Sequence, residues 1–529
     1  MMVRLMLISG MLLASGNLSA QVKSALLDPV DMAGNLEEAL TFQKYATYPQ
    51  YVDMMRYFVD SYPGTCRLDT FGTSEQGRLL LALKISDNAA EEEAEPRFLY
   101  TATMHGNELV GYPLMLRLVH YLLSNYGTDS EVTALVNNLA IWINPLSNPD
   151  ATFYPDNDQS VALSIRQTSN GTDLNRDFPR VVDGDPDDTT GRARETRMMM
   201  EFLRENRFTM SANIHSGAEV VNYPWDYTLD RHADDSWFRF VSREYADEAR
   251  AVDPGYMALF TDGISNGADW YIIHGSRQDY VTWYLGGREV TLELAEEYRM
   301  DSELLDWHWQ INARSLLNYM AQCMYGITGT VTDRETGKVL TDPGTGEPVS
   351  ALISIPGHDS TYSMVRTTTA FGDYYRPVEA GAFDLVASAP GYLNDTVHGV
   401  ETDWYTTTRV DFQLERERKS GTGAELALEG TRIWPNPFRD LFYIDPGTGG
   451  PGSTGTGGPG STGTGGPGST GTREMIVEIH TLTGVTVYGE IHDRDAGTIG
   501  ISPGNLPPGL YLLRLSTPDG SRVFRIVKY

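Results

Sequence analysis

The sequence predicts an α/β domain with a mixed central sheet flanked by helices, followed by two all-β sandwich domains. Strand-like and helix-like stretches alternate from residue 21 to about residue 325, which is typical of an α/β domain. After Gly326 the pattern changes to short alternating strands separated by Gly, Pro and Asp, which indicates a β-sandwich. Residues 431–529 are again rich in strand-like stretches.

The α/β domain at 21–325 is expected to contain buried strands that alternate with apolar helices. The expected strands lie at 97–103, 139–144, 208–214 and 288–294. The expected helices lie at 107–124, 192–206 and 301–323. Because ligands bind at the carboxyl ends of the strands in an open α/β sheet, the residues at these ends are the first candidates for a functional site.

The two β-domains are expected at 326–415 and 431–529, joined by a polar linker at 416–430. The second contains a low-complexity block at 447–472, in which Gly-Thr-Gly-Gly-Pro-Gly-Ser-Thr occurs three times. Because a period of eight without an apolar residue cannot build a core, we interpret this block as a flexible spacer in a surface loop. The strands expected in the first sandwich lie at 327–332, 351–355, 383–387 and 409–414.

The composition limits the partners of the protein. A net charge of −30 argues against nucleic acid, because phosphate binding needs a basic surface. It also argues against a polybasic membrane contact, and it can favour cationic substrates at long range. Cys66 and Cys323 are the two cysteines, and they either pair in an exported protein or remain two buried free thiols.

Residues 1–20 are interpreted as a secretory signal peptide. Arg4 gives a positive n-region, Leu5–Leu13 give a short apolar region, and Leu18-Ser-Ala20 gives a cleavage site that leaves Gln21 first. The alternative is an N-terminal membrane anchor, although the apolar run is short for crossing a bilayer. We expect no transmembrane segment in the mature chain.

Three chemically capable residues fall at the ends of three expected strands. His105 comes two residues after the strand at 97–103, His215 follows a second strand, and Glu293 lies near the end of a third. Glu108 lies three residues after His105, so both can reach one ion. Two imidazoles and one carboxylate suit a catalytic zinc, and a second carboxylate, Glu293, could take a proton from water and pass it to a leaving amine.

Each of these residues also has an ordinary structural interpretation. Taken alone, His105 and Glu108 are better explained as a polar helix start, where Asn107 and Glu108 would serve as capping and dipole partners. His215 alone could be a core histidine with satisfied hydrogen bonds. Glu293 is harder to explain in this way, because an acid in an apolar strand is costly to bury without a partner.

Seven collinear motifs carry a family resemblance. They are Phe71-Gly-Thr-Ser-Glu-Gln-Gly-Arg78, His105-Gly-Asn-Glu108, Asn148-Pro-Asp150, Gly171-Thr-Asp-Leu-Asn-Arg-Asp-Phe-Pro179, His215 to Asp226, Asn266-Gly-Ala-Asp-Trp-Tyr271 and Glu289-Val-Thr-Leu-Glu293. Over residues 40–325 the chain resembles the zinc metallocarboxypeptidases of the carboxypeptidase A superfamily, most closely the subgroup that includes carboxypeptidases N, E, D and M. The resemblance implies the zinc carboxypeptidase fold.

The resemblance implies a role for each residue around the metal. His105, Glu108 and His215 would bind one Zn²⁺ in the catalytic domain. Glu293 would act as general base and then as general acid. Arg166 would polarise the scissile carbonyl and stabilise the oxyanion, where preorganised positive charge is usually a large catalytic term.

The resemblance also implies how substrate is held. Asn175 and Arg176 would bind the terminal carboxylate, which a guanidinium can pair with bidentately, and Tyr271 would close over it. Asp226 and Gln278 fall where the members specific for basic residues carry an acid and a glutamine, which implies a site for C-terminal Lys or Arg.

One stretch departs from the pattern of those members. Their segment at His274-Gly-Ser-Arg277 is usually smaller and uncharged. An inward Arg277 would repel a cationic side chain and oppose the basic preference. We expect instead that Arg277 is a solvated loop charge.

The trailing domains carry further resemblances. Residues 326–415 resemble the transthyretin-like, regulatory β-sandwich that follows the catalytic domain in this subgroup. Residues 431–529 resemble the C-terminal sorting domain of the type IX secretion system, on Ile433-Trp-Pro-Asn-Pro-Phe438, Ile479 to Val485 and Leu506 to Leu513. This implies Sec export to the periplasm and release or anchoring at the surface of a Bacteroidetes-type bacterium, with the type IX machinery as a partner. The alternative is a generic adhesive module.

The sequence therefore predicts a secreted zinc metallocarboxypeptidase that removes C-terminal residues, preferably Lys or Arg, from peptides and proteins. Within enzymes, the alternative is cleavage of neutral residues or of cell-wall peptides. Outside enzymes, it is a catalytically silent surface-binding protein. The complete set of His105, Glu108, His215 and Glu293 disfavours silence.

Overall fold

The computed structural model describes residues 31–360 and 362–417, together with 431–434, 436, 441–445, 474–481, 486–493, 499–504, 506–507, 509–517 and 520–528. The chain divides into two compact units, Met1–Arg416 and Glu417–Tyr529. The predicted signal peptide, the repeat block at 447–472 and nearly all of the predicted linker lie outside the described residues. Among the described residues, no helix combines the length and the apolar character needed to cross a bilayer.

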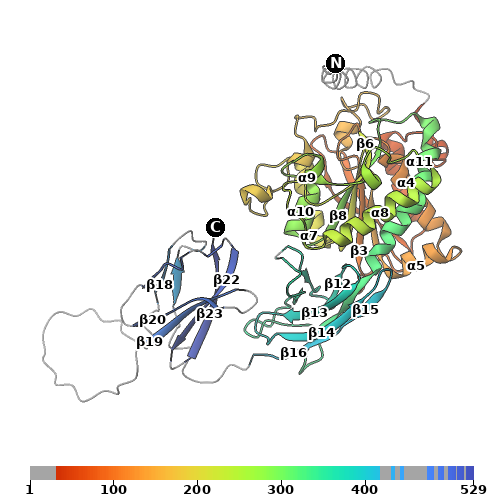
Figure 1. The fold of residues 1–529 in the computed structure, drawn as a ribbon. Coiled ribbons are helices and arrows are strands. Elements are labelled where there is room, and N and C mark those ends of the chain that lie inside the picture. Colours follow the sequence, from red (N-terminus) through yellow and green to blue (C-terminus); the bar gives the residue numbers. More distant parts are fainter. Residues whose placement is uncertain are drawn as a thin grey trace, which may run out of the picture. The chain divides into compact units, whose positions relative to one another are not determined.

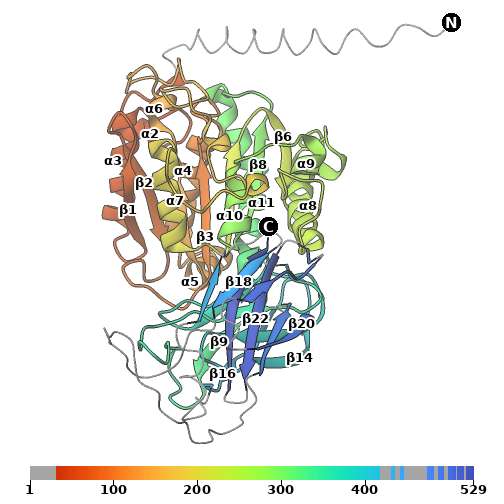
Figure 2. The same cartoon turned by 90° about the vertical axis from the view of Figure 1, so that its left-hand side faces the viewer.

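The first unit is built around an eight-stranded sheet with the order β1-β2-β4-β3-β5-β8-β6-β7. Strands β4, β3, β5 and β8 run parallel at its centre. Strands β1 and β2 pair antiparallel with their neighbours, and β6 pairs antiparallel with β8 and parallel with β7. Figure 2 shows β1 and β6 toward opposite sides of this sheet. The strand bounds are β1 Cys66–Thr73, β2 Leu79–Ile85, β3 Arg97–Ala102, β4 Ala140–Asn144, β5 Met210–His215, β6 Ala218–Tyr223, β7 Ile264–Asn266 and β8 Arg288–Ala295.

Helices cover both faces of the sheet because its central strands are buried on both sides (Figure 1). In β3, Phe98 and Tyr100 join one core while Leu99 joins the other. The first core packs against α3 Tyr48–Ser61, α4 Gly111–Asn125, α5 Ser130–Asn138, α8 Asp235–Val252 and α11 Leu305–Ala321. The second packs against α7 Arg194–Asn206 and α10 Arg277–Tyr284.

Short helices complete the α/β part of the unit. They are α2 Leu36–Ala39, α6 Pro149–Thr152 and α9 Gly267–Trp270, with 3₁₀ turns at η2 Leu174–Arg176, η3 Val181–Asp183, η4 Thr261–Gly263, η5 Ser302–Leu304 and η6 Gln322–Met324. Cys66 and Cys323 are both buried and unpaired, so of the two sequence-based alternatives the structure shows two free thiols. Burial raises the pKa of Cys66 to about 12, which keeps this thiol protonated and unreactive.

Some element boundaries differ from the sequence-based expectation. The helix expected from residue 107 begins at Gly111, and residues 103–110 form a loop. The backbone N–H of Leu109 donates to the carbonyl of Tyr298 at 2.7 Å instead of to a helical partner. A long-range contact thus holds this segment out of the helix, and the interpretation of Glu108 as part of a helix start is wrong. The helix expected at 301–323 begins at Leu305, and the single strand expected at 409–414 is two strands, Thr407–Arg409 and Phe412–Leu414. The other expected strands and helices are confirmed within about two residues at each end.

The first β-sandwich belongs to the same compact unit. One sheet has the order β11-β10-β13-β14, and the other has the order β12-β9-β15, with β16 also pairing with β9. Ile327, Ile353, Leu385 and Phe412 lie in their common core. The bounds are β9 Gly326–Asp333, β10 Leu352–Ser354, β11 Val365–Arg366, β12 Asp373–Arg376, β13 Gly381–Ser388, β14 Asp395–Thr402, β15 Thr407–Arg409 and β16 Phe412–Leu414.

The second unit contains two antiparallel sheets in its described residues, with the orders β17-β18-β21 and β20-β19-β22-β23. Phe442, Val477, Leu513 and Leu515 are buried in its core. The bounds are β17 Arg432–Trp434, β18 Phe442–Asp445, β19 Glu474–His480, β20 Thr486–Asp493, β21 Ile499–Ile501, β22 Gly509–Thr517 and β23 Gly520–Lys528. The predicted fold class, a mixed sheet with helices followed by β-domains, is confirmed.

Candidate active site

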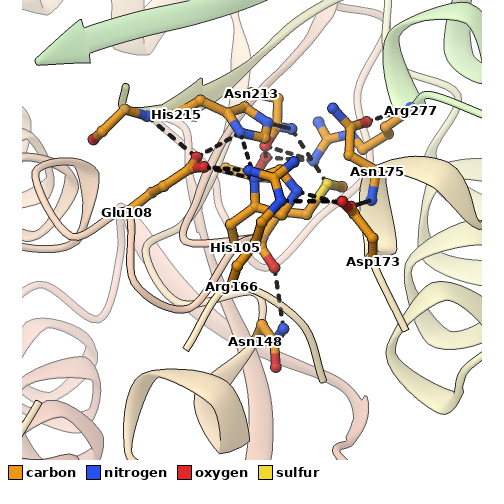
Figure 3. Close-up of polar contacts among 12 residues, drawn as sticks. His105, Glu108, Asn148, Arg166, Asp173, Asn175, Asn213, His215 and Arg277 are labelled. Carbon is orange, nitrogen blue, oxygen red and sulfur yellow. Dashed lines mark hydrogen bonds and ion pairs between the residues drawn. The ribbon is translucent and has the colours of Figure 1, made fainter. Parts of the chain in front are cut away.

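His105, Glu108 and His215 converge at the carboxyl end of the central strands. The first two lie in the loop after β3, and His215 is the last residue of β5. Nδ1 of His105 is 2.8 Å from Oε1 of Glu108, and Nδ1 of His215 is 2.7 Å from Oε2 of Glu108. The two Nδ1 atoms are 3.1 Å apart, and all three residues are buried. Figure 3 shows the three side chains pointing toward one another.

This donor set fits a zinc ion. Imidazole nitrogen and carboxylate oxygen bind zinc at about 2 Å, so two ligands of one tetrahedral ion lie roughly 3.3 Å apart. The observed separations of 2.7–3.1 Å are close to this value, and one ligand atom from each of the three residues lies within 4.8 Å of the others. Three protein ligands are also the number that a catalytic zinc site uses.

The surroundings of Glu108 and His215 favour the protonation states in which these side chains bind a metal. Burial alone would raise the pKa of Glu108, but the two neighbouring histidines hold it well below its usual range. Burial lowers the pKa of His215, whereas in His105 the carboxylates of Glu108 and Asp173 outweigh burial and raise the pKa. Glu108 is therefore ionised and His215 neutral, which are the forms that bind metal.

A second ring of contacts orients the two histidines. Nε2 of His105 lies 3.0 Å from Oδ1 of Asp173, a carboxylate that fixes this ring with Nδ1 turned toward the ligand set. Nε2 of His215 lies 2.6 Å from the side-chain amide of Asn213. Asn148 donates from Nδ2 to the carbonyl of Met104 at 3.1 Å and so holds the start of the ligand loop (Figure 3).

Gly106 explains why a glycine lies inside the ligand motif. A Cβ at this position would lie 2.4 Å from the backbone carbonyl carbon of Ala151 in α6. This distance is a steric clash, so residues other than glycine do not fit here. Asn148 caps α6 through the N–H of Ala151, and Asp150 accepts from Nη1 of Arg78 at 2.8 Å. The motif at 148–150 thus joins the ligand loop to the predicted opening signature at 71–78.

Glu293 lies beside the ligand set on β8. It is the register partner of His215 on the adjacent parallel strand, so both side chains reach the same edge of the sheet. Its Oε2 is buried and has no hydrogen-bond partner among the described residues. Burial, and then the charge of Glu108, raise the pKa of Glu293 well above its usual range, as expected for a group that accepts and returns a proton.

Arg166 reaches the same centre from a loop. Its Nη1 donates to Oε1 of Glu108 at 2.9 Å, and its Nε donates to Oδ2 of Asp173 at 3.0 Å. The side chain of Arg166 is 38% exposed, so part of it remains accessible to a ligand. Arg166 therefore supplies fixed positive charge next to the metal ligands, where the sequence predicts an oxyanion partner.

Asn175 and Arg176 lie together in η2. Oδ1 of Asn175 accepts from the backbone N–H of Arg277 at 2.9 Å, which ties η2 to the start of α10. Gly275 has φ +75°, and a Cβ there would lie 2.6 Å from the carbonyl oxygen of Arg176. A glycine is thus required for this close approach. Tyr271 follows α9 and is 48% exposed. Burial and then the charge of Glu293 raise the pKa of Tyr271, and the charge and hydrogen bond of Arg176 offset part of this rise.

Asp226 is 2% exposed, and its Oδ1 accepts from Nε2 of Gln278 at 3.1 Å and from Nδ2 of Asn222 at 3.3 Å. A Cβ at Gly267 would lie 1.9 Å from this oxygen, so the carboxylate packs directly on the segment that leads to Tyr271. Burial raises the pKa of Asp226. Among the described residues, no cationic nitrogen lies within 4 Å of this carboxylate.

Asp279 is a buried acid that the sequence analysis missed. Its Oδ1 accepts from the backbone N–H of Asp226 at 3.0 Å, while Oδ2 has no partner among the described residues. Burial and the charge of Asp226 raise its pKa well above the usual range. The available signal was its place directly after Gln278 in α10. Two buried carboxyl groups therefore stand at this place in the fold.

The expectation that Arg277 is a solvated loop charge is wrong. The side chain is fully buried, and its Nη2 lies 2.7 Å from Oε2 of Glu289, which is also fully buried. It also donates to Thr101 and, at 3.5 Å, to Oδ1 of Asn213. Because Glu289 neutralises its charge, the inward Arg277 does not carry the uncompensated repulsion that would oppose a cationic side chain.

Comparisons with known proteins agree with this geometry. The model of the zinc carboxypeptidase family, peptidase M14, matches residues 51–314. Carboxypeptidase SOL1 of Arabidopsis thaliana is 34% identical over 386 residues, which cover 71% of this chain and 73% of that protein. The catalytic chain of carboxypeptidase N of Mus musculus is 32% identical over 393 residues, which cover 67% and 82%. This chain belongs to the zinc carboxypeptidase family, which confirms the predicted enzyme class and the implied Zn²⁺.

Carboxypeptidase D of Homo sapiens is 34% identical over 399 residues, which cover 71% of this chain and 28% of that protein. The chain thus spans little more than a quarter of the length of that relative. The structure brings all ten predicted site residues to the neighbourhoods described above, and their individual roles remain predictions.

Proposed function

We propose that this protein is a secreted carboxypeptidase that removes C-terminal Lys or Arg from peptides and proteins. The observation that carries this specificity is the buried carboxylate of Asp226, which has amide partners and no cationic partner within 4 Å among the described residues. An ionised acid in such surroundings is costly unless a cation joins it. A lysine or arginine side chain of the substrate supplies that cation.

The remaining residues define where the substrate backbone lies. Asn175 and Arg176 bind the terminal carboxylate through amide and guanidinium donors, and exposed Tyr271 covers it. The matched names support this assignment, since several relatives are carboxypeptidases. Because the carboxylate and the cationic side chain are held at separate points, the last peptide bond is placed over the metal centre.

The chemistry then needs one proton carrier and one oxyanion partner. Bound by His105, Glu108 and His215, zinc supplies a Lewis acid that favours attack by water on the peptide carbonyl. Glu293 takes a proton from the attacking water at its unpaired Oε2. It later gives this proton to the leaving nitrogen as the C–N bond breaks, and Arg166 stabilises the negative oxygen meanwhile.

We propose that residues 431–529 direct export through the type IX machinery, after Sec export by the signal peptide at 1–20. The support is the sequence resemblance together with a separate compact unit that has its own core. Deleting 431–529 should leave active protein in the periplasm, whereas the full chain should reach the cell surface or medium. Equal surface delivery of both proteins would contradict this part of the proposal.

The proposed activity is tested with blocked dipeptides ending in Arg, Lys, Phe and Glu. We expect cleavage of the Arg and Lys substrates, loss with a chelator, and recovery when zinc is added back. Glu293→Gln should lower kcat by at least about a thousandfold, because it removes the proton carrier. Exposed Glu296 lies three residues further along, and Glu296→Gln serves as the matched control with unchanged rates. Full activity of Glu293→Gln would refute the assignment.

A further inference from the structure

We propose that the β-sandwich at 326–415 positions the Asp226 segment, residues 223–228, through contacts made by Tyr362. These contacts thereby help to set the enzyme's preference for the C-terminal side chain of its substrate. The proposal rests on the function proposed above. It concerns the Tyr362 loop, defined as residues 358–360 and 362–364 between β10 and β11. In this view Tyr362 is a positioning residue that contacts no substrate itself.

The aromatic contacts of Tyr362 lead directly to the two segments that carry the specificity residues. Its ring stacks on Trp283 at 4.9 Å and 27°, and it meets Trp225 edge-on at 4.9 Å and 88°. Trp225 is 1% exposed and directly precedes Asp226. Trp283 lies on α10, the helix that carries Gln278. One ring from the sandwich therefore supports both partners of the Asp226–Gln278 contact.

The backbone of the Tyr362 loop is fixed to the strand that carries Glu293. Arg288 at the start of β8 donates from Nη2 to the carbonyl of Ser363 at 2.7 Å. Gly286 has φ +72°, and a Cβ there would lie 3.2 Å from the carbonyl oxygen of Met364. The loop thus packs closely on residues 286–288, and this contact limits the freedom of the Tyr362 ring.

A buried ion cluster anchors the same loop to the catalytic part. Arg376 of β12 donates from Nη2 to Oδ1 of Asp234 at 2.7 Å and to Oδ1 of Asp359 at 2.6 Å, while Arg288 donates to Oδ2 of Asp234 at 2.6 Å. These four side chains are 0–1% exposed. Asp234, His358 and Asp359 resemble a metal-ligand group in spacing, but the two guanidinium groups already satisfy the carboxylates.

The sandwich makes another aromatic contact that serves as an internal comparison. Trp404 stacks on Phe240 of α8 at 3.7 Å and 19°. Its partner lies on α8, whereas the partners of Tyr362 lie next to Asp226 and on α10. If the sandwich acted only by holding the unit together, losing either contact would have the same consequence.

The experiment compares Tyr362→Ala, Tyr362→Phe and Trp404→Ala in the full chain, each checked for zinc content and thermal unfolding. The first readout is kcat/KM for blocked dipeptides ending in Arg and in Phe. The second is hydrogen–deuterium exchange in a peptide that covers residues 223–228. We expect Tyr362→Ala to lower the Arg-to-Phe ratio about tenfold, since a small misplacement in a site has effects of this order or larger. Exchange at 223–228 should become faster.

The controls separate positioning from general stability. Tyr362→Phe keeps the ring, so both its Arg-to-Phe ratio and its exchange at 223–228 should match those of the wild type. Trp404→Ala should lower the melting temperature and leave the Arg-to-Phe ratio within twofold of the wild type. An unchanged ratio and unchanged exchange in Tyr362→Ala, or the same loss in Trp404→Ala, would overturn the proposal. A wild-type protein without preference for Arg would contradict the proposed function instead. Exchange at 223–228 would then decide whether Tyr362 positions this segment.

Discussion

Asp234 and Asp226 are both buried aspartates, yet their surroundings are opposite. Asp234 receives two guanidinium groups, from Arg288 and Arg376, at 2.6–3.0 Å. Asp226 receives amide donors, from Gln278 and Asn222, and no cationic nitrogen within 4 Å among the described residues. At similar burial, the charge of Asp234 is thus compensated by two guanidinium groups, whereas the charge of Asp226 is not compensated by a nearby cation.

The pKa values express this difference. Burial alone would raise the pKa of Asp234, but Arg376 and Arg288 hold it well below the usual range. Burial raises the pKa of Asp226. Burial and the charge of Asp226 together raise the pKa of Asp279 well above its usual range. Asp234 therefore stabilises the fold as a paired ion, whereas the function proposed above requires that a ligand bring the cation that Asp226 lacks.

The largest effect is expected from removing a partner of the satisfied cluster. Arg376→Met should lower the free energy of unfolding of the first unit by about 3–5 kcal/mol, because it leaves the charge of Asp234 less compensated in the interior. Denaturant titration followed by tryptophan fluorescence measures this change. A loss below about 1 kcal/mol would mean that the cluster is not needed for stability.

A smaller effect of opposite sign is expected at the incomplete site. Asp226→Asn keeps the shape and removes a carboxyl group whose ionised form is poorly compensated. Because burial raises the pKa of Asp226, its ionised form is disfavoured in the folded state, and the free energy of unfolding should rise at pH 7 when the charge is removed. The same titration checks this, and a clear destabilisation would show that Asp226 serves the fold.

The pH dependence of these two changes should also differ. A carboxyl group with a raised pKa contributes stability at low pH that is lost as pH rises from its unfolded value of about 3.9 toward its folded value. The gain from Asp226→Asn should therefore be small near pH 4 and grow toward neutral pH. Asp234, with a lowered pKa, contributes stability that is lost as pH falls below about 4. Thermal unfolding between about pH 2 and pH 8 tests both directions.

The smallest effect is expected at an exposed ion pair in the same sandwich. Arg334 lies 3.4 Å from Glu415, and its side chain is 54% exposed. Because exposed pairs contribute little, Arg334→Met should change the free energy of unfolding by less than about 0.5 kcal/mol. It is the matched control for Arg376→Met, and similar losses in both variants would remove the distinction between buried and exposed arginines.

The convergence of His105, Glu108, His215 and Glu293 could be predicted from the sequence because it depends on local spacing and strand ends. His105 and Glu108 are three residues apart, and His215 and Glu293 are register partners near the ends of neighbouring parallel strands. The start of α4 at Gly111 could not be predicted, because the Leu109–Tyr298 contact joins residues far apart in the chain.

The burial of Arg277 could not be predicted for a similar reason. Its partner Glu289 is only twelve residues away, but the pair forms because α10 packs against β8, and the sequence shows Arg277 as a charge in a loop. The contact between Tyr362 and Trp225 requires two domains to pack together. Local patterns in the sequence thus predicted which residues converge at the candidate site. The contacts that hold these residues in place join distant parts of the chain and could not be predicted.

The most direct test of the account is the ratio of kcat/KM for blocked dipeptides ending in Arg and in Phe, measured with zinc-loaded wild type and Asp226→Asn. Truncating one partner of a buried charge pair costs about 2–5 kcal/mol, or roughly a hundredfold. We predict a strong preference for Arg in the wild type and a fall of about a hundredfold in Asp226→Asn, with cleavage of the Phe substrate retained. Equal rates on both substrates in the wild type, or an unchanged ratio in the variant, would contradict the account.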